Sequence, residues 1–139
     1  MSSVQKSLRI PDEIAKIIQE QAESSGRDFS SVANELLAEA VKLKRCPGIL
    51  FADGPAGRRA RIAGTGLDVW EVISTYKSLN HDDARLRDAY DWLSEPQLRS
   101  ALTYLRLYPD EIERQILRNE SWSKEKLADR HPSLSQARS

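Results

Sequence analysis

Residues 4–45 read VQKSLRIPDEIAKIIQEQAESSGRDFSSVANELLAEAVKLKR, and this stretch decides the fold of the N-terminal part of the chain. Residues 4–10 alternate apolar and polar side chains, which is the pattern of a half-buried strand. Pro11 ends that strand and opens a helix, since the first helical turn has no partner for the N–H that proline lacks. Apolar residues then recur at helical spacing until Gly26, a typical helix stop. The pattern predicts a strand followed by a helix.

A second helix follows this turn, and Ser30 or Ser31 is expected to cap its N-terminus. One strand and two helices cannot stand alone, because a lone strand leaves its backbone N–H and C=O groups unpaired and so short a segment buries little surface. A second copy of the chain is the simplest remedy, with two antiparallel strands above a core of four helices. The sequence therefore predicts an intertwined homodimer, whose two-stranded ribbon fits the major groove of DNA.

Residues 4–43 resemble the ribbon–helix–helix repressors of the Arc/CopG type. The likeness lies in the strand, in its stop at Ile10-Pro11 and in the Gly26-Arg27 turn before the second helix. The resemblance implies that one face of the ribbon reads base edges and that the N-terminus of the second helix holds a backbone phosphate of double-stranded DNA. The alternative is a dimerisation module that does not bind DNA.

The resemblance assigns the DNA contacts to particular residues. The outward strand residues are Gln5, Ser7 and Arg9. These side chains suit base edges, because Gln can pair with adenine, Arg with guanine and Ser with either. Lys6 stands where an apolar residue is common in the family, and we expect it to point toward phosphate instead. Ser30 and Ser31 inherit the phosphate contact at the second helix.

The composition suits a mostly helical, soluble protein. Of the 139 residues, 40% are hydrophobic and 30% charged, and 21 basic residues balance 21 acidic ones. Zero net charge argues against a non-specific nucleic-acid coat protein, but not against a sequence-specific reader. We expect a cytoplasmic protein, because Cys46 is the single cysteine, no apolar run is long enough to span a membrane and the N-terminus has no apolar signal segment.

Cys46-Pro47-Gly48 ends the second helix and predicts a domain boundary after residue 46. Two short runs, 49–52 and 58–62, flank a turn rich in Gly and Pro and predict a small hairpin. The densest basic cluster is Arg58, Arg59 and Arg61. A solvated hairpin face and an auxiliary phosphate contact are both open interpretations of this cluster.

Apolar stripes at helical spacing follow the hairpin. Asp68 and Glu71 have the spacing of a capping box at the start of the first helix, and Pro109 precedes the last one. The second and third of these helices can form a helix-turn-helix. The expected fold class is therefore mainly α, with a ribbon–helix–helix at residues 1–46 and a small helical, helix-turn-helix-like bundle with a short hairpin at residues 47–118.

This second part resembles, less closely, the small antitoxin domain of the VapB kind, over about residues 47–113. The likeness lies in the run Arg61-Ile62-Ala63-Gly64-Thr65 and in the aliphatic and aromatic residues after it. The resemblance implies partnership with a PIN-like ribonuclease toxin. Gly66 stands where the family usually has an arginine, so the chain departs from the family pattern there.

Residues 119–139 are mostly polar and cannot bury enough apolar surface to fold by themselves. We expect a flexible tail that orders on contact with the toxin, with Trp122 and Leu127 as anchors. Arg130 can reach the acidic site of a PIN-like ribonuclease, a role that follows from the resemblance. The alternative is a plain disordered terminus.

No enzyme chemistry, metal site or cofactor is expected. His81 and His131 are far apart, no His/Cys spacing suits a metal, and the glycines lack the spacing of a nucleotide-binding loop. The expected function is a DNA-binding antitoxin of a type II toxin–antitoxin system, which represses its own operon and neutralises the toxin. Two alternatives stay open: a ribbon–helix–helix transcriptional regulator without a toxin partner, and a dimeric adaptor that does not bind DNA.

Overall fold

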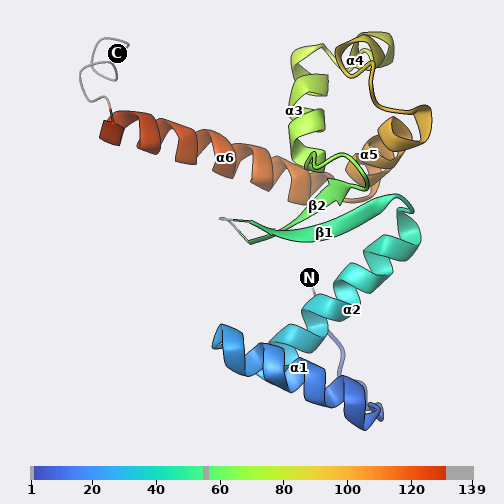
Figure 1. Cartoon of the computed structure of the whole chain (residues 1–139), viewed down its shortest axis with the longest axis vertical. Helices are drawn as coiled ribbons and strands as arrows, with labels where there is room; N and C mark the ends of the chain where they lie inside the picture. Colours follow the sequence, from blue (N-terminus) through green and yellow to red (C-terminus); the bar gives the residue numbers. More distant parts are fainter. Residues whose placement is uncertain (1, 55–56, 131–139) are drawn as a thin grey trace. The chain divides into compact units, whose positions relative to one another are not determined.

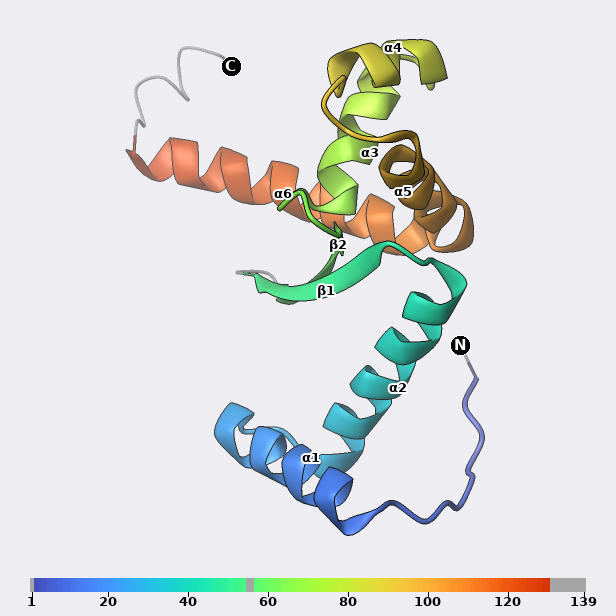
Figure 2. The same ribbon diagram turned by 45° about the vertical axis from the view of Figure 1, so that its right-hand side comes forward.

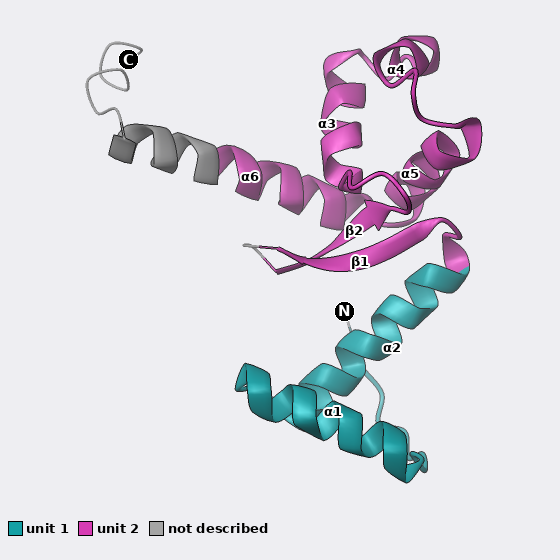
Figure 3. Ribbon diagram, viewed as in Figure 1, with its two compact units in different colours: residues 1–44 teal, residues 45–139 magenta. Residues whose placement is uncertain are grey.

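The computed structural model describes residues 2–54 and 57–130, with side chains up to residue 121 (Figure 1). The described part is mainly helical, with one two-stranded antiparallel sheet. The chain divides into two compact units, Met1–Lys44 and Arg45–Ser139, which we call unit 1 and unit 2 (Figure 3). The division lies next to the boundary that the sequence predicts after residue 46.

Unit 1 is built on two helices, α1 (Asp12–Ser25) and α2 (Phe29–Arg45). Gly26 ends α1 as predicted, with a φ of 68° in the left-handed region that glycine tolerates. The N–H of Arg27 donates to the C=O of Ala22 at 2.9 Å and closes the helix end. The turn between the two helices is therefore set by local sequence.

The strand predicted over residues 4–10 is not present in the single chain, where residues 2–11 have no regular secondary structure. The physical reason is the one that made the sequence predict a dimer: an isolated strand has no neighbour to bond its backbone N–H and C=O groups. The segment leads directly into α1, which begins after Pro11, the proline that was expected to stop the strand.

Unit 2 begins with the predicted hairpin, formed by β1 (Ile49–Gly54) and β2 (Gly57–Ile62) in antiparallel register. Side chains alternate across it, so one face packs into the core of unit 2. The core-facing residues are Ile49, Phe51, Ala60 and Ile62. The opposite face carries Leu50, Ala52, Arg59 and Arg61, which the period of two places together.

Four helices complete unit 2: α3 (Val69–Ser78), α4 (Asp83–Ala89), α5 (Glu95–Leu107) and α6 (Pro109–Arg130). The helix α3 contacts β2, α5 and α6, so it lies at the centre of the unit (Figures 1 and 2). Ser94 caps α5 through a capping box with Gln97, as its sequence indicates. Pro109 occupies the start of α6 rather than its interior.

The core of unit 2 centres on Tyr104, which is fully buried. Its ring lies 4.9 Å from that of Tyr108, and its hydroxyl donates a hydrogen bond to Glu111 at the start of α6. Burial and this hydrogen bond raise the pKa of Tyr104. Arg45 lies over the ring of Tyr108 at 5.3 Å, and Cys46 is buried in the same core, so unit 2 begins before the predicted boundary.

The prediction of a structureless tail from residue 119 is wrong for residues 119–130, because α6 continues to Arg130. The buried side chains of Ile112 and Ile116 attach the first half of the helix to the core of unit 2. Seven of the eleven residues 120–130 are Glu, Lys, Leu, Ala or Arg, which have high helix propensity and extend a helix once its first turns are fixed. Residues 131–139 of the predicted tail lie outside the described residues.

Candidate nucleic-acid and self-association surfaces

The N-terminal segment carries the residues predicted to read DNA. Its exposed polar residues include Gln5, Lys6, Ser7 and Arg9. Residues 2–10 contain no acidic side chain. Val4 and Leu8, which the pattern assigns to a buried face, are 80% and 67% exposed. The structure therefore places the DNA contacts predicted for the strand on one exposed segment, on which Val4 and Leu8 are also exposed.

Both helices of unit 1 also expose apolar side chains. We call the following set the unit 1 apolar surface: Ile14, Ile17, Leu36, Leu37, Val41 and Leu43. Each of these side chains is between 38% and 56% exposed, whereas the core of unit 1 consists of Ile18, Ala22 and Val32. Fully burying one such side chain stabilises a protein by about 1.5–3 kcal/mol. Unit 1 thus leaves more large apolar side chains outside than it buries, as surfaces that bind a partner do.

The N-terminus of α2 differs from the prediction. The cap is Asp28, whose carboxylate accepts a hydrogen bond from the backbone N–H of Ser31 at 2.7 Å. Ser30 and Ser31 lie inside the first turn and do not cap the helix. Asp28 is a stronger cap than either serine because its ionised carboxylate accepts a charge-assisted hydrogen bond at the positive end of the helix. The hydrogen bonds from Ser31 lower the pKa of Asp28.

This cap changes what the helix end can bind. The Ser31 amide is already bonded to Asp28, and a carboxylate at the helix end repels phosphate. The nearby cation, Arg27, forms an ion pair with Glu35 at 3.2 Å and donates to the Ser31 carbonyl at 3.3 Å. The structure therefore provides fewer phosphate donors at Ser30 and Ser31 than the resemblance implies.

The structure divides the three arginines of the hairpin into two groups. Arg59 and Arg61 both bind the carboxylate of Asp68, which is only 3% exposed. Arg61 Nε lies 3.0 Å from Oδ1, Arg59 Nε lies 2.6 Å from Oδ2, and Trp70 Nε1 donates to Oδ2 at 3.1 Å. Arg58 pairs separately with Asp53 at 3.3 Å. Two of the three arginines are therefore tied to a buried acid rather than solvated.

Asp68 precedes α3 but does not cap it, so the predicted capping box with Glu71 is wrong. The charge-assisted contacts to two guanidiniums compete successfully with the weaker bond to a helical N–H. Burial raises the pKa of Glu71, and the neighbouring charge of Asp68 raises it further. The contacts among Arg59, Arg61, Asp68 and Trp70 join β2 to the start of α3.

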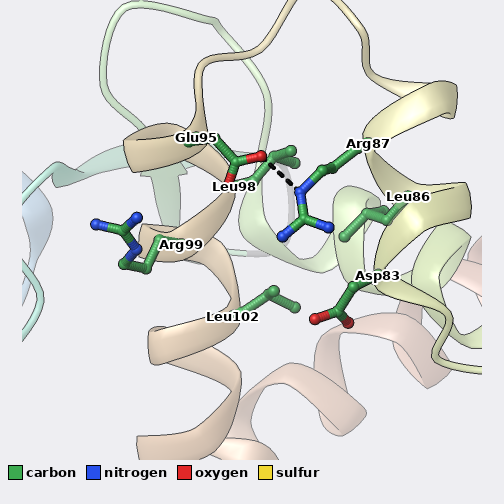
Figure 4. A pocket seen from close by; sticks show the side chains of 7 residues that line it. All are labelled: Asp83, Leu86, Arg87, Glu95, Leu98, Arg99 and Leu102. Carbon is green, nitrogen blue, oxygen red and sulfur yellow. Dashed lines mark hydrogen bonds and ion pairs between the residues drawn. The ribbon is translucent and has the colours of Figure 1, made fainter.

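A cleft of about 220 Å³ lies between α4 and α5 (Figure 4). Leu86, Leu98 and Leu102 form its floor, and an ion pair between Arg87 and Glu95 at 2.5 Å crosses it. Asp83 and Arg99 complete the rim. Because acidic and basic side chains alternate around this cleft, it favours neither anions nor cations.

The residues predicted to bind a partner all lie on the far half of α6. Trp122, Leu127 and Arg130 fall within the helix, but their side chains lie outside the described part. Leu117, just before them, is 60% exposed. In the ranges 2–54 and 57–121 the structure shows no group of three or more His, Cys, Asp or Glu that could hold a metal ion. None of the described helices has the length and apolar character needed to cross a membrane.

Sequence reasoning could have found one of the two acids that it missed. Asp28 precedes Phe29 directly, and Asp is as strong a cap as Ser. Nothing local marks Asp68 as the partner of Arg59 and Arg61, since the contact depends on the fold.

Comparison of the chain with protein-family models, curated proteins and solved structures gave no match.

Proposed function

We propose that this protein is a DNA-binding antitoxin of a type II toxin–antitoxin system, a cytoplasmic homodimer that represses its own operon and neutralises a PIN-like ribonuclease. The observation that carries the proposal is the unit 1 apolar surface, which is exposed in the single chain, as Val4 and Leu8 are. A second copy is the cover with matching chemistry, because an isologous interface pairs one apolar patch with itself.

Dimerisation also gives the N-terminal segment a reason to become a strand. Residues 4–10 of two copies supply each other's missing backbone partners in an antiparallel ribbon. Their alternation then turns Val4 and Leu8 toward the apolar core and Gln5, Ser7 and Arg9 toward the opposite face. That outer face is basic and can donate to base edges, which suits the major groove.

Phosphate contacts in this proposal fall mainly on Lys6, since Asp28 occupies the end of α2. Few phosphate contacts mean a modest dependence of affinity on salt. Base contacts and several half-sites then supply most of the specificity.

Neutralisation of a toxin is supported by the resemblance of residues 47–113 and by the form of α6. That helix extends well past Ile116, the last buried residue among its described side chains. A helix that leaves its own core can place anchors in a groove on a partner. Trp122, Leu127 and Arg130 are the residues we assign to this contact.

Two measurements test the proposal. Co-expression with the product of the adjacent gene should yield a stable complex whose mass gives the stoichiometry, and a chain truncated after Arg118 should lose most of that binding. A gel shift on the DNA upstream of the gene should give a specific complex. Specific DNA binding without a protein complex would favour the transcriptional regulator, and a dimer without either would favour the adaptor.

A further inference from the structure

The outward face of the hairpin holds two guanidiniums close to one carboxylate. Arg59 and Arg61 each place Nε on Asp68, at 2.6 and 3.0 Å. The Arg59 contact is an ion pair without the alignment of a hydrogen bond. In the part of the chain that the structure describes, neither arginine has a further hydrogen bond or ion pair. The terminal Nη groups of both arginines are therefore available to another acceptor.

Contacts with neighbouring residues fix the position of the Arg59 and Arg61 side chains, although both are partly exposed. Asp68 is 3% exposed and is itself fixed by the indole N–H of Trp70. The Arg59 guanidinium lies over Gly54, where a Cβ atom would stand 1.5 Å from Nη1. The Arg59 and Arg61 side chains are still 22% and 31% exposed. Because the Arg59 Nε atom is buried, the exposed part of that side chain belongs to its other atoms.

Charge is not balanced at contact distance. Asp68 is the acid in contact with both guanidiniums. Glu71 lies near enough for its charge to act on both arginines, but it forms no ion pair with either among the described residues. Guanidinium forks match the oxygens of phosphate, and donors fixed in advance lose less freedom when they bind. An anion that accepts from both Nη groups would complete the cluster.

We infer that Arg59 and Arg61 form a binding site for one phosphate group, with Asp68 and Gly54 positioning the two guanidiniums. The phosphate is either a free ion or part of a nucleic-acid backbone, since the site recognises the group and not its carrier. The site belongs to unit 2 and stands apart from the DNA contacts proposed for unit 1.

The first test uses the full wild-type chain with ¹⁵N labelling. Inorganic phosphate is titrated against chloride at constant ionic strength and pH, and the indole N–H signals are followed by NMR. We expect the Trp70 signal, which reports on Asp68, to shift and saturate, while the signal of the exposed Trp92 stays in place. A Trp70 signal that does not move, or that moves without saturating, would leave Arg59, Arg61 and Asp68 with a structural role only.

Variants then connect the response to the arginines. Arg61→Lys keeps the charge but removes the fork, so phosphate affinity should fall about tenfold, as the loss of a charge-assisted hydrogen bond predicts. Arg114→Lys, on the exposed side of α6, is the matched control and should bind as the wild type does. Equal affinity in both variants would overturn the assignment. The wild-type titration decides the matter even if Arg61→Lys does not fold.

A second arm identifies the carrier of the phosphate. For a backbone phosphate, Arg61→Gln should reduce the slope of log K against log salt for upstream DNA by about 0.9 for each lost contact. An unchanged slope with a Trp70 response to inorganic phosphate assigns the site to a free phosphate. Complete absence of DNA binding would count against the proposed function, whereas the NMR titration would still decide this inference.

Discussion

At the scale of single residues, two acids have roles that differ from those predicted from the sequence. Asp68 has the spacing of a cap but binds two arginines, and Asp28 caps α2 where a serine was expected. Both outcomes follow from the same preference, because a carboxylate takes the strongest donors within reach. Local spacing names the candidates, and the fold chooses among them.

Replacing Asp28 by alanine should lower the urea midpoint of unfolding, because α2 loses its cap. The pKa of Asp28 is below its ordinary value of 3.8 in the folded chain, so the stabilisation is complete above about pH 5 and disappears as pH falls through the folded pKa. Midpoints of both proteins measured from pH 7 to pH 3 should therefore converge at low pH. Ser30→Ala is the control and should give little change, whereas a larger loss there would restore Ser30 as the cap.

Replacing Asp68 by asparagine should destabilise the protein by about 3–5 kcal/mol, since the two guanidiniums in contact with this buried carboxylate lose their counter-charge. Chemical denaturation followed by far-UV circular dichroism measures this loss. Asp53→Asn breaks an ion pair in the same hairpin whose acid is 89% exposed, and should cost about 0–1 kcal/mol. Similar costs for both variants would mean that the buried cluster contributes no more than a surface pair.

Replacing Arg9 by alanine should weaken binding to the cognate DNA by about 1–3 kcal/mol and relax the preference at one base position. The physical reason is the loss of a two-point contact to a base edge. Binding to a panel of single-base variants of the upstream site measures both effects, with Ser2→Ala as the control. A uniform loss across the panel would make Arg9 a phosphate contact.

At the scale of elements, α6 combines two kinds of helix. Ile112 and Ile116 are buried in unit 2, whereas Leu117 on the next position is 60% exposed. A 22-residue helix is therefore anchored at one end only within the described side chains. Packing accounts for the first half and helix propensity for the second.

Replacing Ile112 by alanine should cost about 2–5 kcal/mol, as for other fully buried aliphatic side chains. Leu117→Ala on the same helix is the matched control and should stay within about 0.5 kcal/mol. Denaturant unfolding of the two variants measures the difference. If Leu117→Ala proves as costly as Ile112→Ala, then Leu117 is covered in solution, and a partner or second copy must contact α6.

The elements show how far the sequence could be read. Turn signals at Gly26 and Pro109 gave correct helix ends, and the Gly- and Pro-rich turn after residue 52 gave the hairpin, because these are local effects. The strand predicted over residues 4–10 is absent from the single chain, and it stays a prediction that depends on backbone partners from another molecule. The contacts of Asp68 and the continuation of α6 depend on residues distant in sequence or on small propensities, which short patterns do not report.

At the scale of the whole molecule, the two units differ in completeness. Unit 2 buries an extended core around Tyr104, whereas unit 1 buries three side chains. A unit with so small a core does not offset the entropy of ordering its own chain. Association is the most direct source of the missing stability.

Replacing Leu37 by lysine should dissociate the dimer, because a charge is placed in an interface that the second copy must desolvate. Light scattering should report at least twice the chain mass of 15.7 kDa for the wild type and a lower mass for the variant. Leu117→Lys, on an equally exposed leucine of unit 2, should leave the mass unchanged. A wild-type protein that stays monomeric would overturn the proposed ribbon.

The close approach of Arg59 to Gly54 makes substitutions at these two positions depend on each other. A side chain at residue 54 would occupy the volume that the guanidinium now fills. An evolutionary lineage that exchanges Gly54 for a larger residue must also shorten or redirect residue 59. Glycine and arginine at these two positions should therefore be inherited as a pair, and a diverged descendant that keeps the pair should also keep an acid at residue 68.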